Sequence, residues 1–166
     1  DEFGPLDLKP ELGQNWRPKG KPNRVPATYR RTQGVQFLFA AYDLHSDKLY
    51  GHMKQRRRWK EFLQFLKTIR KRYSISERLY IVLDNLRVHK KAEVMQWVEK
   101  NNVEFVFTPT NASWLNRIEC HFAPIRKFAL QNTAYKLKKE QAKAIRRYIA
   151  WRLSLIHISE PTRQAE

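Results

Sequence analysis

The sequence predicts an α/β domain in which helices flank a mixed sheet. A strand pair joined by a short turn precedes a series in which helical and strand-like segments alternate. A hairpin followed by alternating β and α units is typical of an α/β sandwich. The chain has 166 residues, of which 42% are hydrophobic, so it is long enough to bury one core.

The predicted hairpin lies in the first third of the chain. The apolar run 36–42 has the length of a strand, and residues 48–53 form its partner across a turn at Ser46 and Asp47. Residues 9–31, which precede it, are rich in proline, glycine and basic side chains. This composition predicts a long basic loop.

Helices and strands alternate after the hairpin. Residues 59–73 carry apolar side chains at helical spacing, which predicts a helix with one buried stripe. Residues 79–83 are continuously apolar and end at Asp84, as expected for a strand buried on both faces. The other predicted elements are a helix over 91–100, a strand over 103–107, a helix from Asn116 to Leu130 that Pro124 kinks or restarts, and a basic helix over 138–152.

The charge balance indicates the kind of partner. There are 33 Lys and Arg residues against 16 Asp and Glu, a formal net charge of +17. Such a charge favours a polyanion, either nucleic acid or an anionic membrane surface. No apolar run approaches the ~20 residues that span a bilayer. The single cysteine, Cys120, excludes a disulfide framework and a four-cysteine zinc site, and it indicates a reducing, cytoplasmic compartment.

Positive charge is concentrated in two stretches. Residues 54–72 carry nine positive charges and one acid, Glu61, and the last predicted helix is also strongly basic. A solvated helix surface is the alternative, but this density favours contact with phosphates. The residues predicted to bind nucleic acid are Arg56, Arg57, Arg58, Lys60, Lys143, Arg146 and Arg147.

Three acids are placed where a cleft is expected. Asp84 ends a predicted strand, Glu119 lies in the helix after the next strand, and Asp1 can enter from an adjacent strand. Converging carboxylates repel one another unless a cation neutralises them, and oxygen ligands suit Mg²⁺ or Mn²⁺. Two such ions about 3.5–4 Å apart activate a water or hydroxyl and stabilise the leaving oxygen of a phosphodiester. As alternatives, Asp84 caps the next segment, Glu119 is a favourable helix N-terminal charge, and Asp1 frays.

Three ordered blocks of residues resemble a known family. They are Asp-Glu-Phe-Gly at 1–4, Leu-Asp-Asn at 83–85 followed by His89, and Thr-Pro-Thr-Asn-Ala-Ser-Trp-Leu-Asn-Arg-Ile-Glu at 108–119. These blocks resemble those of DDE transposases, in particular bacterial insertion-sequence transposases related to the mariner group. The thirty-four residues between Asp84 and Glu119 match the spacing in that group. The resemblance extends over residues 1–152, which we expect to be the catalytic domain.

The resemblance implies a ribonuclease-H-like fold. The strand that carries the first Asp is central in that fold, with the hairpin on one side and the 79–83 strand on the other. Because Asp1 opens the sequence, we expect that strand to be largely truncated. The resemblance further implies cleavage of transposon ends and their joining to target DNA, by a homo-oligomer on paired ends in the bacterial cytoplasm, at the nucleoid.

The resemblance also implies the site residues. Asp1, Asp84 and Glu119 match the catalytic metal ligands, which hold two Mg²⁺ ions that Mn²⁺ can replace. Asn85, His89 and Asn116 match supporting positions, although local packing is an equal alternative for His89. Arg117 stands where many relatives have proline, and we expect it to contact a DNA phosphate.

Several alternatives remain open at this point. Another nuclease of the same fold, or an inactive remnant that only binds nucleic acid, is also compatible with the sequence. Residues 153–166 resemble a translated sequencing-library adapter, so we expect a non-native tail there; a divergent genuine C-terminus is the alternative. We expect Cys120, Trp114 and Trp151 to pack in the core.

Overall fold

The computed structural model describes residues 1–14, 16–22, 24–26, 33–110 and 112–154. Residues 15, 23 and 27–31 of the predicted basic loop and residues 155–166 of the predicted tail therefore lie outside the described residues. The elements in chain order are β1 (Glu2–Leu6), β2 (Gln36–Asp43), β3 (Lys48–Lys54), α1 (Trp59–Arg70), β4 (Leu79–Leu83), α2 (Ala92–Lys100), β5 (Val103–Phe107), a 3₁₀ turn η1 (Ser113–Leu115), α3 (Glu119–Ile125), a π-helical turn η2 (Arg126–Leu130) and α4 (Lys138–Ser154).

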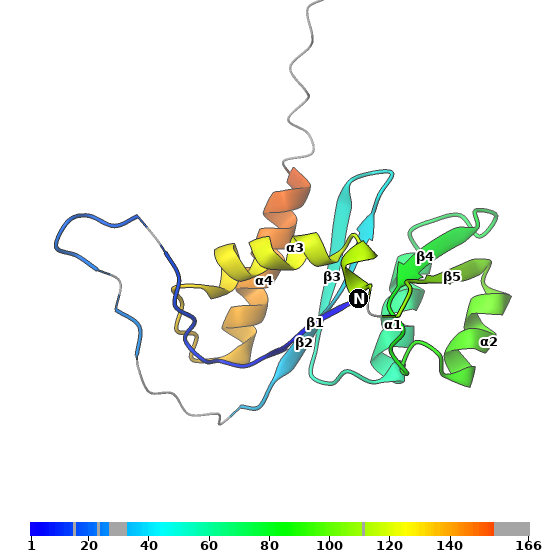
Figure 1. Ribbon diagram of the computed structural model, residues 1–166, viewed down its shortest axis with the longest axis horizontal. Helices are drawn as coiled ribbons and strands as arrows, with labels where there is room; N and C mark the ends of the chain where they lie inside the picture. Colours follow the sequence, from blue (N-terminus) through cyan, green and yellow to red (C-terminus); the bar gives the residue numbers. More distant parts are fainter. Residues whose placement is uncertain (15, 23, 27–32, 111, 155–166) are drawn as a thin grey trace, which may run out of the picture.

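The strands form two sheets, which Figure 1 shows side by side. The first sheet has the order β1-β2-β3 with antiparallel neighbours, and the second is the parallel pair β4-β5. The β2–β3 register runs without interruption from the Phe37–Lys54 pair to the Asp43–Lys48 pair, which confirms the predicted hairpin. Asp47 in its turn adopts the left-handed backbone conformation, with φ of 51°.

Strand β1 differs from expectation in its partners. It pairs with β2 and not with β4, whose partner is β5. Figure 1 shows the reason, because β1 starts between the two sheets and runs away from β4. The ladder with β2 is irregular between Phe3 and Leu6, where Pro5 lacks the N–H that a ladder needs. Strand β1 has five residues and follows directly after Asp1.

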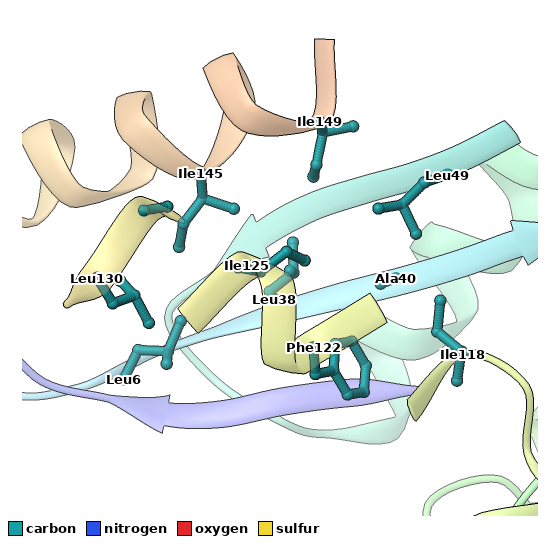
Figure 2. Packing of buried hydrophobic residues seen from close by; sticks show 11 residues of the cluster. Leu6, Leu38, Ala40, Leu49, Ile118, Phe122, Ile125, Leu130, Ile145 and Ile149 are labelled. Carbon is teal, nitrogen blue, oxygen red and sulfur yellow. The ribbon is translucent and has the colours of Figure 1, made fainter. Parts of the chain in front are cut away.

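The first core cluster lies between the three-stranded sheet and the last helices. Successive side chains of a strand point to opposite faces, and Leu38 and Ala40 of β2 face α3 and α4. Ile125 and Ile145 from those helices are fully buried against them, as Figure 2 shows. This packing anchors the short helix α3, which begins with Glu119.

The second core cluster lies on the opposite face of β2. Phe39, the neighbour of Leu38, points to this face and packs with α1, α2 and the β4–β5 sheet. Helix α1 presents the predicted apolar stripe but ends at Arg70, not at Tyr73. The buried Arg70 guanidinium donates to the carbonyl oxygens of Ser74 and Glu77, which holds the chain in a turn before β4.

The prediction that β4 is buried on both faces is wrong. Leu83 is buried, but Tyr80 and Val82 are 64% and 43% exposed, and Val106 of β5 is 43% exposed on the same face. Helices α1 and α2 bury the other face of this parallel pair. Within the described residues, no helix is long and apolar enough to cross a membrane.

The region of α3 also differs in detail. The predicted helix from Asn116 begins at Glu119, after the 3₁₀ turn, and passes into the π-helical turn after Pro124. Cys120 and Trp114 were expected in the core, but both are exposed. Cys120 is exposed because α3 turns Phe122 and Ile125 toward the sheet. Trp151, also expected in the core, is 51% exposed and packs beside Tyr148 and Phe128 on α4 and η2.

Candidate active site

Asp1 lies where the two sheets meet. Its backbone nitrogen donates to the carbonyl of Ala40 at 2.8 Å, and its carbonyl accepts from the Ala40 N–H at 2.8 Å. The Asp1 side chain is held as well, because Oδ1 accepts from the Glu2 N–H at 2.7 Å and Oδ2 accepts from Asn116 Nδ2 at 3.0 Å. In this structure Asp1 is paired with β2 and does not fray.

Asn116 joins Asp1 to the helix of Glu119. The Asn116 side chain, only 4% exposed, donates to Asp1, while its carbonyl accepts from the Glu119 N–H at 3.0 Å. Glu119 itself is exposed at the first position of α3. One buried amide therefore connects the first and third sequence blocks.

Asp84 follows the last residue of β4, as predicted. Its Oδ1 accepts from the Leu86 N–H at 3.3 Å. Asp84 therefore does cap the segment that follows β4, as the alternative interpretation of this residue expected. The same oxygen lies 3.1 Å from Nδ1 of His89, which is also 3.2 Å from the Asp84 carbonyl. His89 is fully buried, with its ring 4.3 Å from that of Phe62. It therefore packs in the core and contacts Asp84 at the same time.

Asn85 lies beside Asp84 but binds elsewhere. Its Nδ2 donates to the Thr108 carbonyl, and its Oδ1 accepts from Lys90 Nζ at 2.6 Å. The bond to Thr108 ties the end of β4 to the end of β5, and the bond from Lys90 ties it to the segment before α2. We infer that Asn85 supports the geometry of the strand ends, since both polar ends of its side chain are engaged there.

Glu2 is the residue of this site that was missed from the sequence. Its side chain is fully buried, and Oε1 lies 3.2 Å from Nε2 of His89. Oε2 is buried and makes no hydrogen bond to any described residue. The available signal was a carboxylate at the first position of a short strand that is otherwise uncharged. A charged side chain is rarely buried unless it has a partner.

Three acids act electrostatically on the buried Asp1 amino group. Burial lowers the pKa of the Asp1 amino group below its ordinary value of 8.0, and the negative charges of Glu2, Asp84 and Glu119 act in the opposite direction. Each of these three acids therefore lies within electrostatic range of the Asp1 amino group. Their hard oxygen atoms suit Mg²⁺ or Mn²⁺ in chemistry. In the described part of the chain, however, no three Asp, Glu, His or Cys side chains stand close enough together to hold one ion.

The predicted DNA-binding residues are all exposed, and they form two sets. Helices α1 and α4 cover opposite faces of β2, so the residues from 56 to 60 are separated from those on α4. Arg58 is engaged by Glu61 at 2.5 Å, and Arg57 lies 5.7 Å from the ring of Phe37. Arg117 lies two residues before Glu119 and is exposed. The exposed predicted residues are Arg56, Arg57, Arg58, Lys60, Arg117, Lys143, Arg146 and Arg147.

These features define a ribonuclease-H-like α/β domain with acids gathered at the end of one strand, beside a second strand and at the start of a helix. The chain belongs to the DDE superfamily endonuclease family, whose sequence model matches residues 1–141. This confirms the family that the three sequence blocks resemble.

Individual relatives agree with this assignment. The chain is 23% identical over 120 residues to the insertion element IS630 uncharacterized 39 kDa protein of Shigella sonnei, covering 69% of this chain and 33% of the relative. It is similar in fold to the Mos1 strand transfer complex, with a TM-score of 0.64, 16% identity, and coverage of 95% of this chain and 48% of that one. For the Mos1 mariner paired end complex with Mn, the TM-score is 0.60, with 16% identity and 95% and 50% coverage. The chain thus spans about half the length of these solved structures and a third of the curated relative.

Proposed function

We propose that this chain is the catalytic domain of a DNA transposase. It cleaves transposon ends and joins them to target DNA by metal-dependent phosphodiester hydrolysis and transesterification. The observation that carries the proposal is the buried Asn116 amide, which links the Asp1 carboxylate to the start of the Glu119 helix. Membership of the DDE superfamily endonuclease family supports it.

We assign the acids as follows. Asp1, Asp84 and Glu119 would hold two Mg²⁺ ions, which Mn²⁺ could replace, and the ions would supply activation of a water or hydroxyl and stabilisation of the leaving oxygen. Asn116 orients the Asp1 carboxylate and the first turn of α3. His89 fixes the Asp84 side chain, whose Oδ1 it contacts.

DNA is the proposed partner, as transposon end and as target. Arg117 is exposed two residues before Glu119, so it is suited to contact a DNA phosphate. The two basic sets belong to segments that pack on opposite faces of β2. We therefore assign each set to a different DNA segment in a homo-oligomer on paired ends. The proposed place of action is the bacterial cytoplasm, at the nucleoid.

The test is metal-dependent nicking of a supercoiled plasmid by the whole chain. We expect nicking with Mn²⁺ or Mg²⁺, and its loss in Asp84→Asn and in Glu119→Gln. Glu93→Gln is the matched control, because Glu93 is also an exposed acid in the first turn of a helix, α2. If Glu119 served only as a helix N-terminal charge, both glutamine variants would lose about 0.3–1 kcal/mol of stability and keep nicking.

Two further measurements separate the rival activities. Joining of a cut end to a second DNA distinguishes a transposase from a simple nuclease of the same fold. DNA binding that none of the substitutions alters, with no nicking under any metal condition, would establish the inactive nucleic-acid-binding remnant instead.

A further inference from the structure

Glu2 makes a contact whose use the proposed chemistry leaves open. The strand alternation turns Phe3 into the first core cluster, and Glu2 lies on the opposite side with His89. Both of these polar side chains are fully buried, and their closest atoms, Oε1 and Nε2, are 3.2 Å apart. The second Glu2 oxygen, Oε2, makes no hydrogen bond within the described residues.

A buried carboxylate at residue 2 does not by itself stabilise the fold. Burial of a charged or polar oxygen without a partner opposes folding, and well-packed apolar residues in place of a buried pair are often neutral or stabilising. The ring of Phe62 already fills the space beside His89. Packing therefore gives no reason for a carboxylate at residue 2.

The contacts instead form a continuous path to the proposed metal ligand. Glu2 Oε1 faces Nε2 of His89, and Nδ1 on the other side of the same ring faces Asp84 Oδ1 at 3.1 Å. An imidazole held at both nitrogens has one fixed orientation, and partners of this kind orient metal-binding side chains. The path links the residue after Asp1 to Asp84 across 82 positions of sequence.

We propose that Glu2 is a positioning residue for the metal-binding carboxylate of Asp84, and that it acts through the buried ring of His89. This inference rests on the proposed function, since it takes Asp84 to be a ligand of the divalent ion. Glu2 does not contact the ion; it fixes the ring that fixes the ligand.

The side-chain chemistry supplies discriminating variants. In Glu2→Gln, the amide can accept from or donate to Nε2, so the ring stays fixed in either tautomer. In Glu2→Met, a side chain of similar length fills the space but makes no such bond. His89→Asn retains an amide donor near the position of Nδ1, toward Asp84, and loses the contact to Glu2. Gln36→Met is the matched control, because it breaks a buried polar pair with Gln141 in the other core cluster.

The experiment measures Mn²⁺ affinity of the whole chain, by the electron paramagnetic resonance signal of free Mn²⁺, and the Tm of the metal-free protein. Loss of a partner that orients a ligand typically weakens metal binding about 10–100-fold. We expect Glu2→Met to weaken Mn²⁺ binding at least ~10-fold, and Glu2→Gln to restore it to within about threefold of the parent, a shift below the 10-fold that marks a lost partner. Gln36→Met lowers the Tm and leaves Mn²⁺ affinity unchanged.

A double-substitution cycle tests the route through His89. Once His89→Asn has cut the contact with Glu2, adding Glu2→Met brings no further loss of Mn²⁺ affinity if the path runs through the ring. Equal Mn²⁺ affinity of Glu2→Met and the parent, or full additivity in the cycle, would overturn the positioning role alone. If the parent chain binds no Mn²⁺, or binds it equally after Asp84→Asn, the metal assignment of the proposed function fails and this inference fails with it.

Discussion

A methyl group added at Gly51 tests the packing between β3 and α4. Gly51 lies in the middle of β3, and a Cβ built there is 2.6 Å from Cδ1 of Ile149 and 2.9 Å from Cδ1 of Leu38. Ordinary contacts between such carbons are about 3.5–4.0 Å, so both neighbours must move by roughly an ångström. Leu38 is fully buried and Ile149 is 7% exposed, which leaves little room for that movement.

The expected cost of Gly51→Ala follows from two opposing terms. Overpacking of a buried site costs about 1–3 kcal/mol. Replacing glycine in a strand regains roughly 0.5–1 kcal/mol, because the unfolded chain has less freedom to lose. With the middle value of each range, the net destabilisation is about 1 kcal/mol. For a chain of this size the Tm then falls by ~2–4 °C. Circular dichroism melts and urea unfolding measure both quantities.

Ile149→Val supplies the decisive control, because it removes the Cδ1 atom nearest to the new methyl group. Alone, this substitution costs about 0.5–1.5 kcal/mol. Combined with Gly51→Ala, it should raise the Tm above that of Gly51→Ala alone, so its sign reverses. A Tm of Gly51→Ala at or above that of the parent, or simple additivity in the double variant, would refute this account of the packing.

Two further predictions concern stability. Ile125→Ala should lower the free energy of unfolding by about 2–5 kcal/mol, because Ile125 is fully buried and anchors the helix that begins with Glu119. Urea titration measures this loss, with Val82→Ala at an exposed site as the comparison. An equal loss in the two variants would contradict the assignment of Ile125 to the core. Burial, with the positive charges of Lys54 and Arg72, lowers the pKa of His52 below its ordinary value of 6.5. The unfolded chain therefore binds a proton at His52 more readily than the folded chain. The stability that neutral His52 allows is complete above about pH 6.5 and is lost as the pH falls below that value. The Tm difference between about pH 7.5 and 5.5 should shrink in His52→Gln, and an unchanged difference would show that His52 carries none of it.

Local patterns were sufficient for the hairpin and for most helices. The run from Gln36 to Tyr42 and the stripe of α1 depend on residues close together in sequence, and the structure confirms both. The two-sided burial of β4 was predicted from its continuous apolar sequence and is wrong. Hydropathy reports which side chains favour burial, but whether an element covers Tyr80 and Val82 is a property of the whole arrangement.

The candidate site was predictable in part. The three acids were predicted from motif order and spacing, and their role as metal ligands stays a prediction. The structure joins two of the sequence blocks, because Asn116 donates to Asp1. Glu2 was missed because its importance lies in a contact with His89, 87 positions away, which no local pattern reveals. The separation of the basic residues into two sets was also invisible, since it depends on which face of β2 each helix covers.

The bond from Asn116 to Asp1 joins residues 115 positions apart. Closing so long a loop costs entropy, which the packing of both core clusters offsets. The link between the first and third sequence blocks therefore depends on the folded arrangement of distant segments. An ion that binds only the folded chain raises the apparent stability by RT ln(1 + [L]/Kd). If Asp1, Asp84 and Glu119 hold the ion as proposed, a rise of the Tm with added Mn²⁺ reports complete folding of the chain, even when no DNA is present.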